Sequence, residues 1–395
     1  MASTIQSIDT GNYQTKVFDG QNVTVTQSLI AQLLSGTKMT TVPSETTRML
    51  HYLGGSRKDL VGKMYIIGAG AEDRASAKPL AEHASKTQMA LQLILACLQL
   101  PETGGHFALT KLALFLPEIA VEWQMLIDSV EGEHSFVVNG VNHRIEIPRE
   151  AISVFQEGSG VNHFVRQRGL VSADEYLGVL DVGGGTFIGS LFNQSGELID
   201  ESRRIVGNDN RWGVYSGLAT MISGSPLFVQ GLGKTGDPQL IASAIARAEY
   251  ESVPDPQEPT SLFLHPKQPL IYGTTGFDFS DIFSECNTAW TRACIREVWA
   301  TWSHWQSRIG RIVVSGGGAP LLSAFINHPD QQRLGKFFIP YDSAFPHTNQ
   351  VANAVGGYGM ISSDVEISGS HPFLETSLES SNGRTPEVAP SVSRK

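Results

Sequence analysis

Cysteines and long hydrophobic runs are scarce in this sequence. Its 395 residues include three cysteines, Cys97, Cys286 and Cys294, and no CxxC pair. Isolated thiols of this kind favour a reduced cytoplasm over a disulfide framework. No run of about 18 apolar residues occurs, so the sequence predicts neither a transmembrane helix nor a membrane partner. The N-terminus, MASTIQSIDTG, lacks the basic and apolar regions of a signal peptide.

Positive charge is also in short supply. Lysine and arginine number 29 against 39 acidic residues, which gives a formal net charge of −10. Because affinity for DNA comes largely from lysine and arginine on phosphates, we expect no direct binding of nucleic acid. The 11 histidines show no metal-ligand spacing. Gly233-Lys234-Thr235 is similar to the end of a P-loop, but Phe228 stands where the first glycine is required.

Two acidic turns with glycine are the main positive signal. Asp9-Thr10-Gly11-Asn12 follows a short apolar run and is closed by Lys16. Asp181, with Gly183, Gly184, Gly185 and Thr186 after it, repeats the arrangement in the second half of the chain. Each turn places an aspartate at the end of a strand, with one residue between it and the first glycine.

Phosphate binding on a β-hairpin needs this combination of residues. Glycine lets backbone N–H groups approach phosphate oxygens closely, and an aspartate can hold a metal ion that accompanies the phosphates through water. Lysine adds a point charge for phosphate. The alternative for Asp9, Asp181 and Lys16 is an ordinary turn acid or a solvated lysine, since aspartate is common in turns. Two such turns, spaced for two domains, favour a nucleotide clamped between them.

A third glycine cluster follows a predicted buried strand. Gly316, Gly317 and Gly318 come after Arg311–Val314 and form a bare turn that can lie flat against a base or ribose. The alternative is a helix cap before Leu321.

The order of these three motifs resembles that of the actin-like ATPases. In detail it resembles the bacterial ParM and StbA branch, which segregates plasmids. The sequence DTGNYQTK is similar to the phosphate-1 signature of that branch, and Asp181–Thr186 to its phosphate-2 signature. Gly316–Gly318 is similar to the adenosine motif, and 351–358 to the second connecting helix. The resemblance extends from about Ile5 to Met360.

The resemblance implies an α/β protein with the actin-like (ribonuclease-H-like) two-domain fold and a nucleotide in the interdomain cleft. The first domain is expected over residues 1–170 with the return of 345–362, and the second over 171–344. Residues 363–395, rich in serine, glutamate and proline, are expected to form a disordered tail.

Function follows from the same resemblance. It implies an ATPase that assembles into filaments to move plasmid DNA, with ATP and Mg²⁺ as cofactors and GTP as the alternative nucleotide. The implied partners are other copies of the chain and a DNA-binding adaptor. Asp9 and Asp181 would approach the metal, with Asp181 also serving in catalysis.

Hydrolysis also needs a group that orients the attacking water. Glu150 is the first candidate, because it begins a predicted helix at the position where actin-like enzymes carry a glutamine or glutamate. The alternative is an acid that complements the helix dipole. Gln156 and Glu157, about two turns later, are the second candidates.

Periodicity and turn residues predict the remaining elements. Strands and hairpins are expected over 5–30, 63–68, 112–116, 134–147, 177–192 and 198–204. Helices are expected over 78–100, 118–130, 150–168, 212–224, 238–250 and 281–309. The prolines of 251–270 predict a loop.

Other functions share parts of this pattern. A chromosomal cytoskeletal filament of the same fold would have the same active site. A monomeric small-molecule kinase of the superfamily would need a catalytic aspartate and a substrate pocket, for which the sequence has no signature. A chaperone ATPase would need a substrate-binding β-domain, for which the chain after residue 361 is too short.

Overall fold

The computed structural model describes residues 2–34, 42–72, 74–80, 86–207, 212–254, 262–345 and 347–362. The chain combines a large sheet and a smaller one with helices, which confirms the predicted α/β class. Residues Met1–Ser362 form one compact unit, so the boundary expected between residues 170 and 171 stays a prediction. The predicted tail, 363–395, lies outside the described residues. Among those that are described, no helix is long and apolar enough to cross a lipid bilayer.

The first sheet has 11 strands in the described part of the chain. They run in the order β3-β2-β1-β8-β10-β9-β5-β6-β4-β7, and β11 pairs with β8. Their bounds are β1 Ala2–Thr10, β2 Gln14–Phe18, β3 Val23–Gln27, β4 Leu29–Leu33, β5 Thr47–Gly55, β6 Met64–Gly68, β7 Lys78–Pro79, β8 Gly105–Leu116, β9 Gly132–Val138, β10 Val141–Ile147 and β11 Ile152–Gln156.

The second sheet repeats the central part of the first. Its order is β14-β13-β12-β17-β18, with bounds β12 Tyr176–Val182, β13 Phe187–Phe192, β14 Arg204–Ile205, β17 Ile309–Ser315 and β18 Phe337–Phe338. In each sheet an antiparallel hairpin, β1–β2 or β12–β13, pairs in parallel with a later strand, β8 or β17. The sequence repeat is therefore a structural repeat, and it places a glycine turn at the same point of each sheet.

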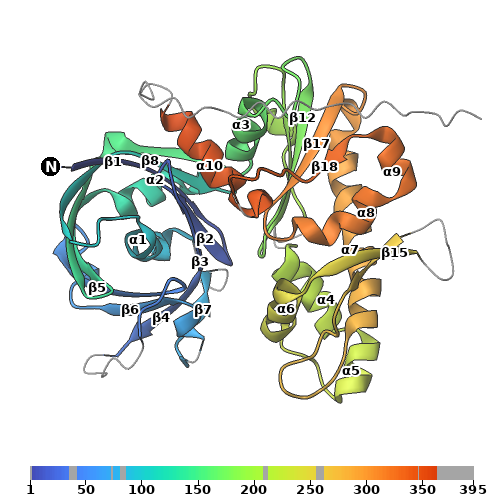
Figure 1. Cartoon of the computed structure of the whole chain (residues 1–395), viewed down its shortest axis with the longest axis horizontal. Helices are drawn as coiled ribbons and strands as arrows, with labels where there is room; N and C mark the ends of the chain where they lie inside the picture. The colour runs from blue at the N-terminus through green and yellow to red at the C-terminus, as the bar shows by residue number, and fades with distance from the viewer. Residues whose placement is uncertain are drawn as a thin grey trace, which may run out of the picture. The chain divides into compact units, whose positions relative to one another are not determined.

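Ten helices lie among the described residues and cover the sheets. Their bounds are α1 Lys86–Cys97, α2 Ile119–Val130, α3 Ser159–Gln167, α4 Thr220–Ser223, α5 Pro226–Leu232, α6 Pro238–Arg247, α7 Ser280–Thr301, α8 Ser323–Asn327, α9 Pro329–Leu334 and α10 Thr348–Ser362. The first sheet curves around α1 (Figure 1), whose Leu91, Ile94 and Leu95 are fully buried. A helix that is apolar on most sides is stable only when it is enclosed in this way.

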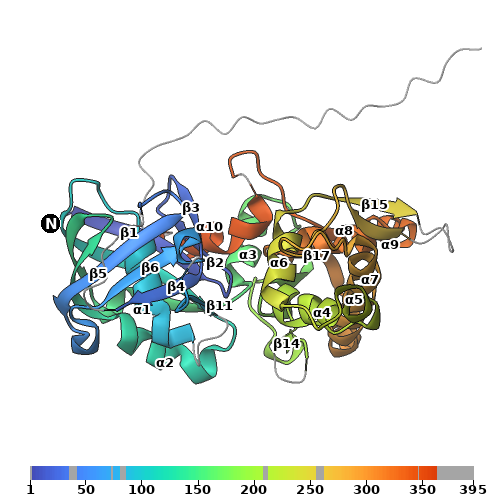
Figure 2. The same ribbon diagram turned by 90° about the horizontal axis from the view of Figure 1, so that it is seen from below.

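Helices α3 and α10 lie between the two sheets in both views (Figures 1 and 2). They share one buried cluster with β12 and β17, which includes Phe164, Val179, Val313 and Val351. Their backbones touch, because a Cβ on Gly356 would overlap the carbonyl oxygen of Gly160. This contact fixes the position of α10, which carries several residues of the site described below.

Replacing Gly356 with alanine is expected to lower the free energy of unfolding by about 1–3 kcal/mol, because the added methyl group overfills the contact with α3. The loss should appear although alanine is the better helix former. Urea denaturation would measure it. Gly54→Ala is the control, since a Cβ at Gly54 meets no atom within 4 Å. Equal stability of the Gly356→Ala variant and the parent would show that the helices separate without cost.

Several predicted elements differ from the structure. The helix expected over 150–168 is a 3-10 turn, Arg149–Ala151, followed by β11 and then α3. The loop expected over 251–270 contains the hairpin β15 Tyr250–Pro254 and β16 Leu262–Pro266, with proline at the last position of each strand. In both segments β-branched and aromatic residues favour strand, and a neighbouring strand is available to pair with them.

Candidate functional site

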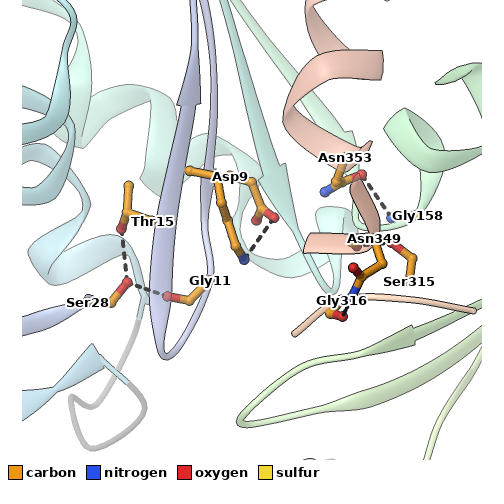
Figure 3. Close-up of polar contacts among 10 residues, drawn as sticks. Asp9, Gly11, Thr15, Ser28, Gly158, Ser315, Gly316, Asn349 and Asn353 are labelled. Carbon is orange, nitrogen blue, oxygen red and sulfur yellow. Dashed lines mark hydrogen bonds and ion pairs between the residues drawn. The ribbon is translucent and has the colours of Figure 1, made fainter. Parts of the chain in front are cut away.

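The first glycine turn joins β1 to β2 and is held from below by Ser28. The Ser28 hydroxyl donates to the carbonyl of Gly11 at 2.6 Å and lies 2.9 Å from the Thr15 hydroxyl (Figure 3). The Ser28 N–H also donates to the carbonyl of Tyr13 at 2.8 Å. With its carbonyl groups held on this side, the turn is fixed before any ligand arrives.

Asp9 and Lys16 face each other across the same hairpin. They are paired in the strand register, and Lys16 Nζ lies 3.4 Å from Asp9 Oδ2 (Figure 3). Each side chain is about 10% exposed. The hairpin thus brings a buried cation and a carboxylate together at the end of a strand.

The second glycine turn joins β12 to β13. The N–H of Gly183 donates to the carbonyl of Thr186 at 2.8 Å and closes it. Backbone N–H groups at the start of the helical segment Val214–Ala219 donate to this turn. Gly213, the residue before that segment, and the segment's first two residues donate to the three successive carbonyls of Gly183, Gly184 and Gly185. A Cβ on Gly213 would crowd the Gly183 and Gly184 carbonyl oxygens at 2.6 Å. This turn is thus also held through its carbonyls.

The third glycine turn follows β17 and is tied to the start of α10. The N–H of Gly316 donates to the carbonyl of Asn349 at 2.7 Å, and the Asn349 side chain donates back to the carbonyl of Gly316 at 2.9 Å (Figure 3). Gly316 has φ 89°, a left-handed conformation that favours glycine. The N–H of Gly318 donates to the carbonyl of Val182 and so joins this turn to the second one.

One cavity of about 60 Å³ lies where the three turns meet. It is lined by residues from both sheets and from α10, namely Asp9, Gly11, Asn12, Tyr13, Gln14, Lys16, Glu157, Asp181, Gly183, Gly184, Gly185, Thr186, Ser315, Gly316, Gly317, Gln350 and Asn353. Most of the predicted nucleotide-binding residues therefore converge on one place. Thr10, Gly318 and Glu150 do not line it.

The first and second turns touch across this cavity. A Cβ on Gly184 would overlap the Tyr13 ring, and one on Gly185 would overlap the Asn12 amide. The Tyr13 ring also packs against Tyr215, with centroids 5.4 Å apart. The first and second turns are therefore in direct contact in this structure.

The structure places Glu150, the first candidate for orienting water, outside the cavity. Glu150 is exposed, lies on the 3-10 turn before β11, and does not line the cavity. Because Ile152–Gln156 extends as a strand beside β8, the chain travels well past Glu150 before it reaches the cavity. Glu157, the second candidate, arrives there and is 6% exposed. Gln156 does not line the cavity.

Glu157 is held by its backbone. Its N–H donates to the carbonyl of Leu116 at 2.9 Å, and its carbonyl accepts from Arg203 at 3.1 Å. Arg203 also donates to the Pro117 carbonyl at 2.6 Å and to the Ser190 hydroxyl at 2.7 Å. Burial lowers the pKa of the Arg203 guanidinium, while the carboxylates of Glu157 and Asp181 act in the opposite direction. The Arg203 guanidinium therefore lies near the carboxylates of Glu157 and Asp181.

The sequence interpretation missed several lining residues. Tyr13 and Gln14 lie inside the first motif, and Gln350 and Asn353 lie on α10. Glu157 carried a usable signal, because the glycines of Gly158-Ser159-Gly160 follow it directly, as a turn leading into a helix would require. Gln350 and Asn353 had no local sequence signal for a place in the site, because only the packing of α10 brings them to the glycine turns.

The acidic residues suit a hard divalent cation. Asp9 and Asp181 line the same cavity and offer carboxylate oxygens, the ligand type that Mg²⁺ prefers. The described residues contain no group of three or more histidine, cysteine, aspartate or glutamate side chains that could hold a metal. An ion here would therefore complete its coordination with phosphate oxygens and water.

The arrangement of the two sheets, with paired hairpin turns facing one cavity, defines the fold as actin-like. No protein-family model matches the sequence. No curated protein matches it either.

Solved structures confirm the fold and its likeness to ParM. An archaeal actin homologue matches with a TM-score of 0.65 and 15% identity, covering 91% of this chain and 99% of its own. The subunit of a 15-stranded ParM filament from Clostridium botulinum matches with a TM-score of 0.62 and 14% identity, covering 91% and 99%. The archaeal homologue in complex with ADP matches with a TM-score of 0.60 and 15% identity, covering 91% and 99%.

Proposed function

We propose that this protein is an actin-like ATPase that assembles into nucleotide-dependent filaments and moves plasmid DNA in the cytoplasm. One observation carries the proposal: three glycine turns, two aspartates, a lysine and a glutamate line a single cavity. Residues 1–170 with 345–362, and residues 171–344, would act as the two domains that close on the nucleotide. ATP is the proposed nucleotide, and GTP is the alternative.

Each part of the cavity has a separate task in binding. Backbone N–H groups of Gly11, Asn12 and Gly184–Thr186 would contact phosphate oxygens, because the carbonyls of both turns are already held by hydrogen bonds within the protein. Lys16 would add positive charge at the phosphates. Gly316 and Gly317 would lie against the base or ribose. Bound Mg²⁺ would neutralise phosphate charge, with Asp9 and Asp181 facing its waters.

Hydrolysis would depend on Glu157. It replaces Glu150 in this role, because it is the only one of the three candidate residues to line the cavity. Its carboxylate would orient a water in line with the terminal phosphate. Since its backbone is fixed at both the N–H and the carbonyl, the side chain starts from a defined position.

The proposals for filament assembly and for the DNA cargo rest on the structural likeness to ParM and on the net charge of the chain. The ParM with which this chain shares its fold forms a 15-stranded filament, which supports self-association here. The net charge of −10 disfavours direct contact with DNA, so a DNA-binding adaptor is the proposed link to the plasmid.

Phosphate release in the presence of Mg²⁺ tests the enzymatic part of the proposal. We expect steady turnover with ATP, none in excess chelator, and a rate with GTP that ranks the two nucleotides. Turnover that requires an added sugar or other small acceptor, with the phosphate recovered on that acceptor, would favour the kinase reading instead.

A further inference from the structure

Asn353, in the second turn of α10, is buried in the wall of the cavity. It is 3% exposed. Its side chain meets the loop between β11 and α3, where the Gly158 N–H donates to Asn353 Oδ1 at 3.3 Å (Figure 3). Gly158 directly follows Glu157. The asparagine therefore lies beside the residue proposed to orient the attacking water.

The hydrogen bond decides which way the amide faces. A backbone N–H can only donate, so the atom that it meets must be the carbonyl oxygen of the asparagine. The amide nitrogen, Nδ2, is then on the other side of the group. Figure 3 shows this nitrogen turned away from Gly158, toward the side of the cavity where Asp9 lies.

The nitrogen has no hydrogen-bond partner among the described residues, although it is buried. A buried donor without an acceptor is destabilising, and folded proteins rarely contain one. The backbone carbonyl of Asn353 also lies against Gly160, so the two helices cannot move closer there, and the Gly158 N–H holds the side chain in place. The donor is thus fixed in place, without an acceptor, in a wall of the proposed nucleotide site.

We infer that Asn353 is a further residue of the reaction centre and that its Nδ2 donates a hydrogen bond to an oxygen of the reacting group. That oxygen belongs either to the terminal phosphate or to the water that attacks it. The inference rests on the proposed function. It adds a neutral donor from α10 to a site whose charged residues come from the turns and loops of the two sheets, and it makes the position of α10 a condition for turnover.

Asn353→Asp is the variant that separates this role from a structural one. A carboxylate can still accept the Gly158 N–H, so the link to α3 is kept, but it cannot donate into the cavity. We expect kcat to fall about 10²-fold, the scale for loss of one preorganised donor. If the acceptor is a phosphate oxygen, affinity for triphosphate should weaken while affinity for diphosphate holds. If it is water, both affinities should stay within error.

The pH dependence gives a second readout. The new carboxyl would share the cavity with three carboxylates, Asp9, Glu157 and Asp181, and with one cation, Lys16, which already pairs with Asp9. Burial among an excess of like charges raises a carboxyl pKa. Once protonated, it regains an O–H donor. The ratio of variant to parent kcat should therefore rise as pH falls from 8 to 6, which a purely structural role would not produce.

Asn287→Asp is the matched control. Asn287 is an equally buried asparagine on α7, 2% exposed, and it does not line the nucleotide cavity. This variant should lose stability but keep the kcat of the folded protein and its pH profile. Parental kcat and pH profile in Asn353→Asp, with active parent protein, would overturn the inference alone. A parent that hydrolyses no nucleotide would overturn both the inference and the proposed function.

Discussion

Glu157→Gln is expected to reduce ATP hydrolysis by about 10²–10⁴-fold while nucleotide affinity changes little. The amide keeps the size of the side chain but loses the basic carboxylate that orients and activates water, and such groups contribute on this scale. Loss confined to the transition state should lower kcat rather than affinity. Single-turnover phosphate release and equilibrium binding of a fluorescent nucleotide would separate the two quantities.

Glu150→Gln is the control for that variant. Glu150 is exposed, outside the cavity, and only seven positions earlier in the chain. It should hydrolyse ATP at the parental rate. If instead Glu150→Gln lost activity and Glu157→Gln kept it, the assignment made from the cavity would be wrong and the original sequence prediction would be right.

Asp181→Ala is expected to abolish metal-dependent hydrolysis without unfolding the protein. Asp181 ends β12 at the cavity, so its removal deletes a carboxylate near the metal and empties no part of the core. Loss of an outer ligand typically weakens metal affinity by about 10–100-fold. Titration of phosphate release with Mg²⁺ would show whether any turnover remains at concentrations that saturate the parent, and circular dichroism would check the fold.

Asp281→Ala serves as its control, since that carboxylate lies on the surface of α7 with 98% of its side chain exposed. It should leave the Mg²⁺ dependence unchanged. An Asp181→Ala variant that turns over at the parental rate and the parental Mg²⁺ concentration would exclude a role for Asp181 in holding the ion.

The glycine turns were predictable because their signals are local. An aspartate at the end of an apolar run, followed by glycine, specifies a hairpin turn within a few residues. Asp9, Gly11, Asp181, Gly183 and Gly316 all line the cavity as a result. The doubling of the motif indicated the actin-like fold, because each half carries the same hairpin and parallel strand.

The position of Glu157 at the cavity could not be predicted in the same way. Whether Ile152–Gln156 is helix or strand depends on the edge of β8, which offers its backbone for pairing. The strand separates Glu150 from the cavity and brings Glu157 to it. The error arose from tertiary pairing that overrides local preference.

Contacts between segments that are distant in the chain could not be predicted from the sequence either. Asn353 meets Gly158, 195 residues away in the chain, and Tyr13 packs on Gly184 from the opposite sheet. Neither pair has a local pattern. Both arise only when α10 packs on α3 and the two hairpins face each other.

We expect nucleotide to drive assembly by favouring one arrangement of the two sheets. Triphosphate would bridge the turns of Asp9 and Asp181 and favour one arrangement of the two sheets, and a nucleotide shifts such an equilibrium only by its preference for that arrangement. Contacts that do not close into a ring then give open filaments. Since subunits of net charge −10 repel each other, Mg²⁺ and moderate salt should assist assembly.

Light scattering combined with pelleting would test whether nucleotide drives assembly. The parent and Glu157→Gln would be compared with ATP, GTP, ADP and a non-hydrolysable analogue. We expect transient polymer with ATP, stable polymer with the analogue and little polymer with ADP. The Glu157→Gln variant should form long-lived polymer with ATP. A protein that stays monomeric at high concentration with every nucleotide, or that polymerises equally without any, would contradict it.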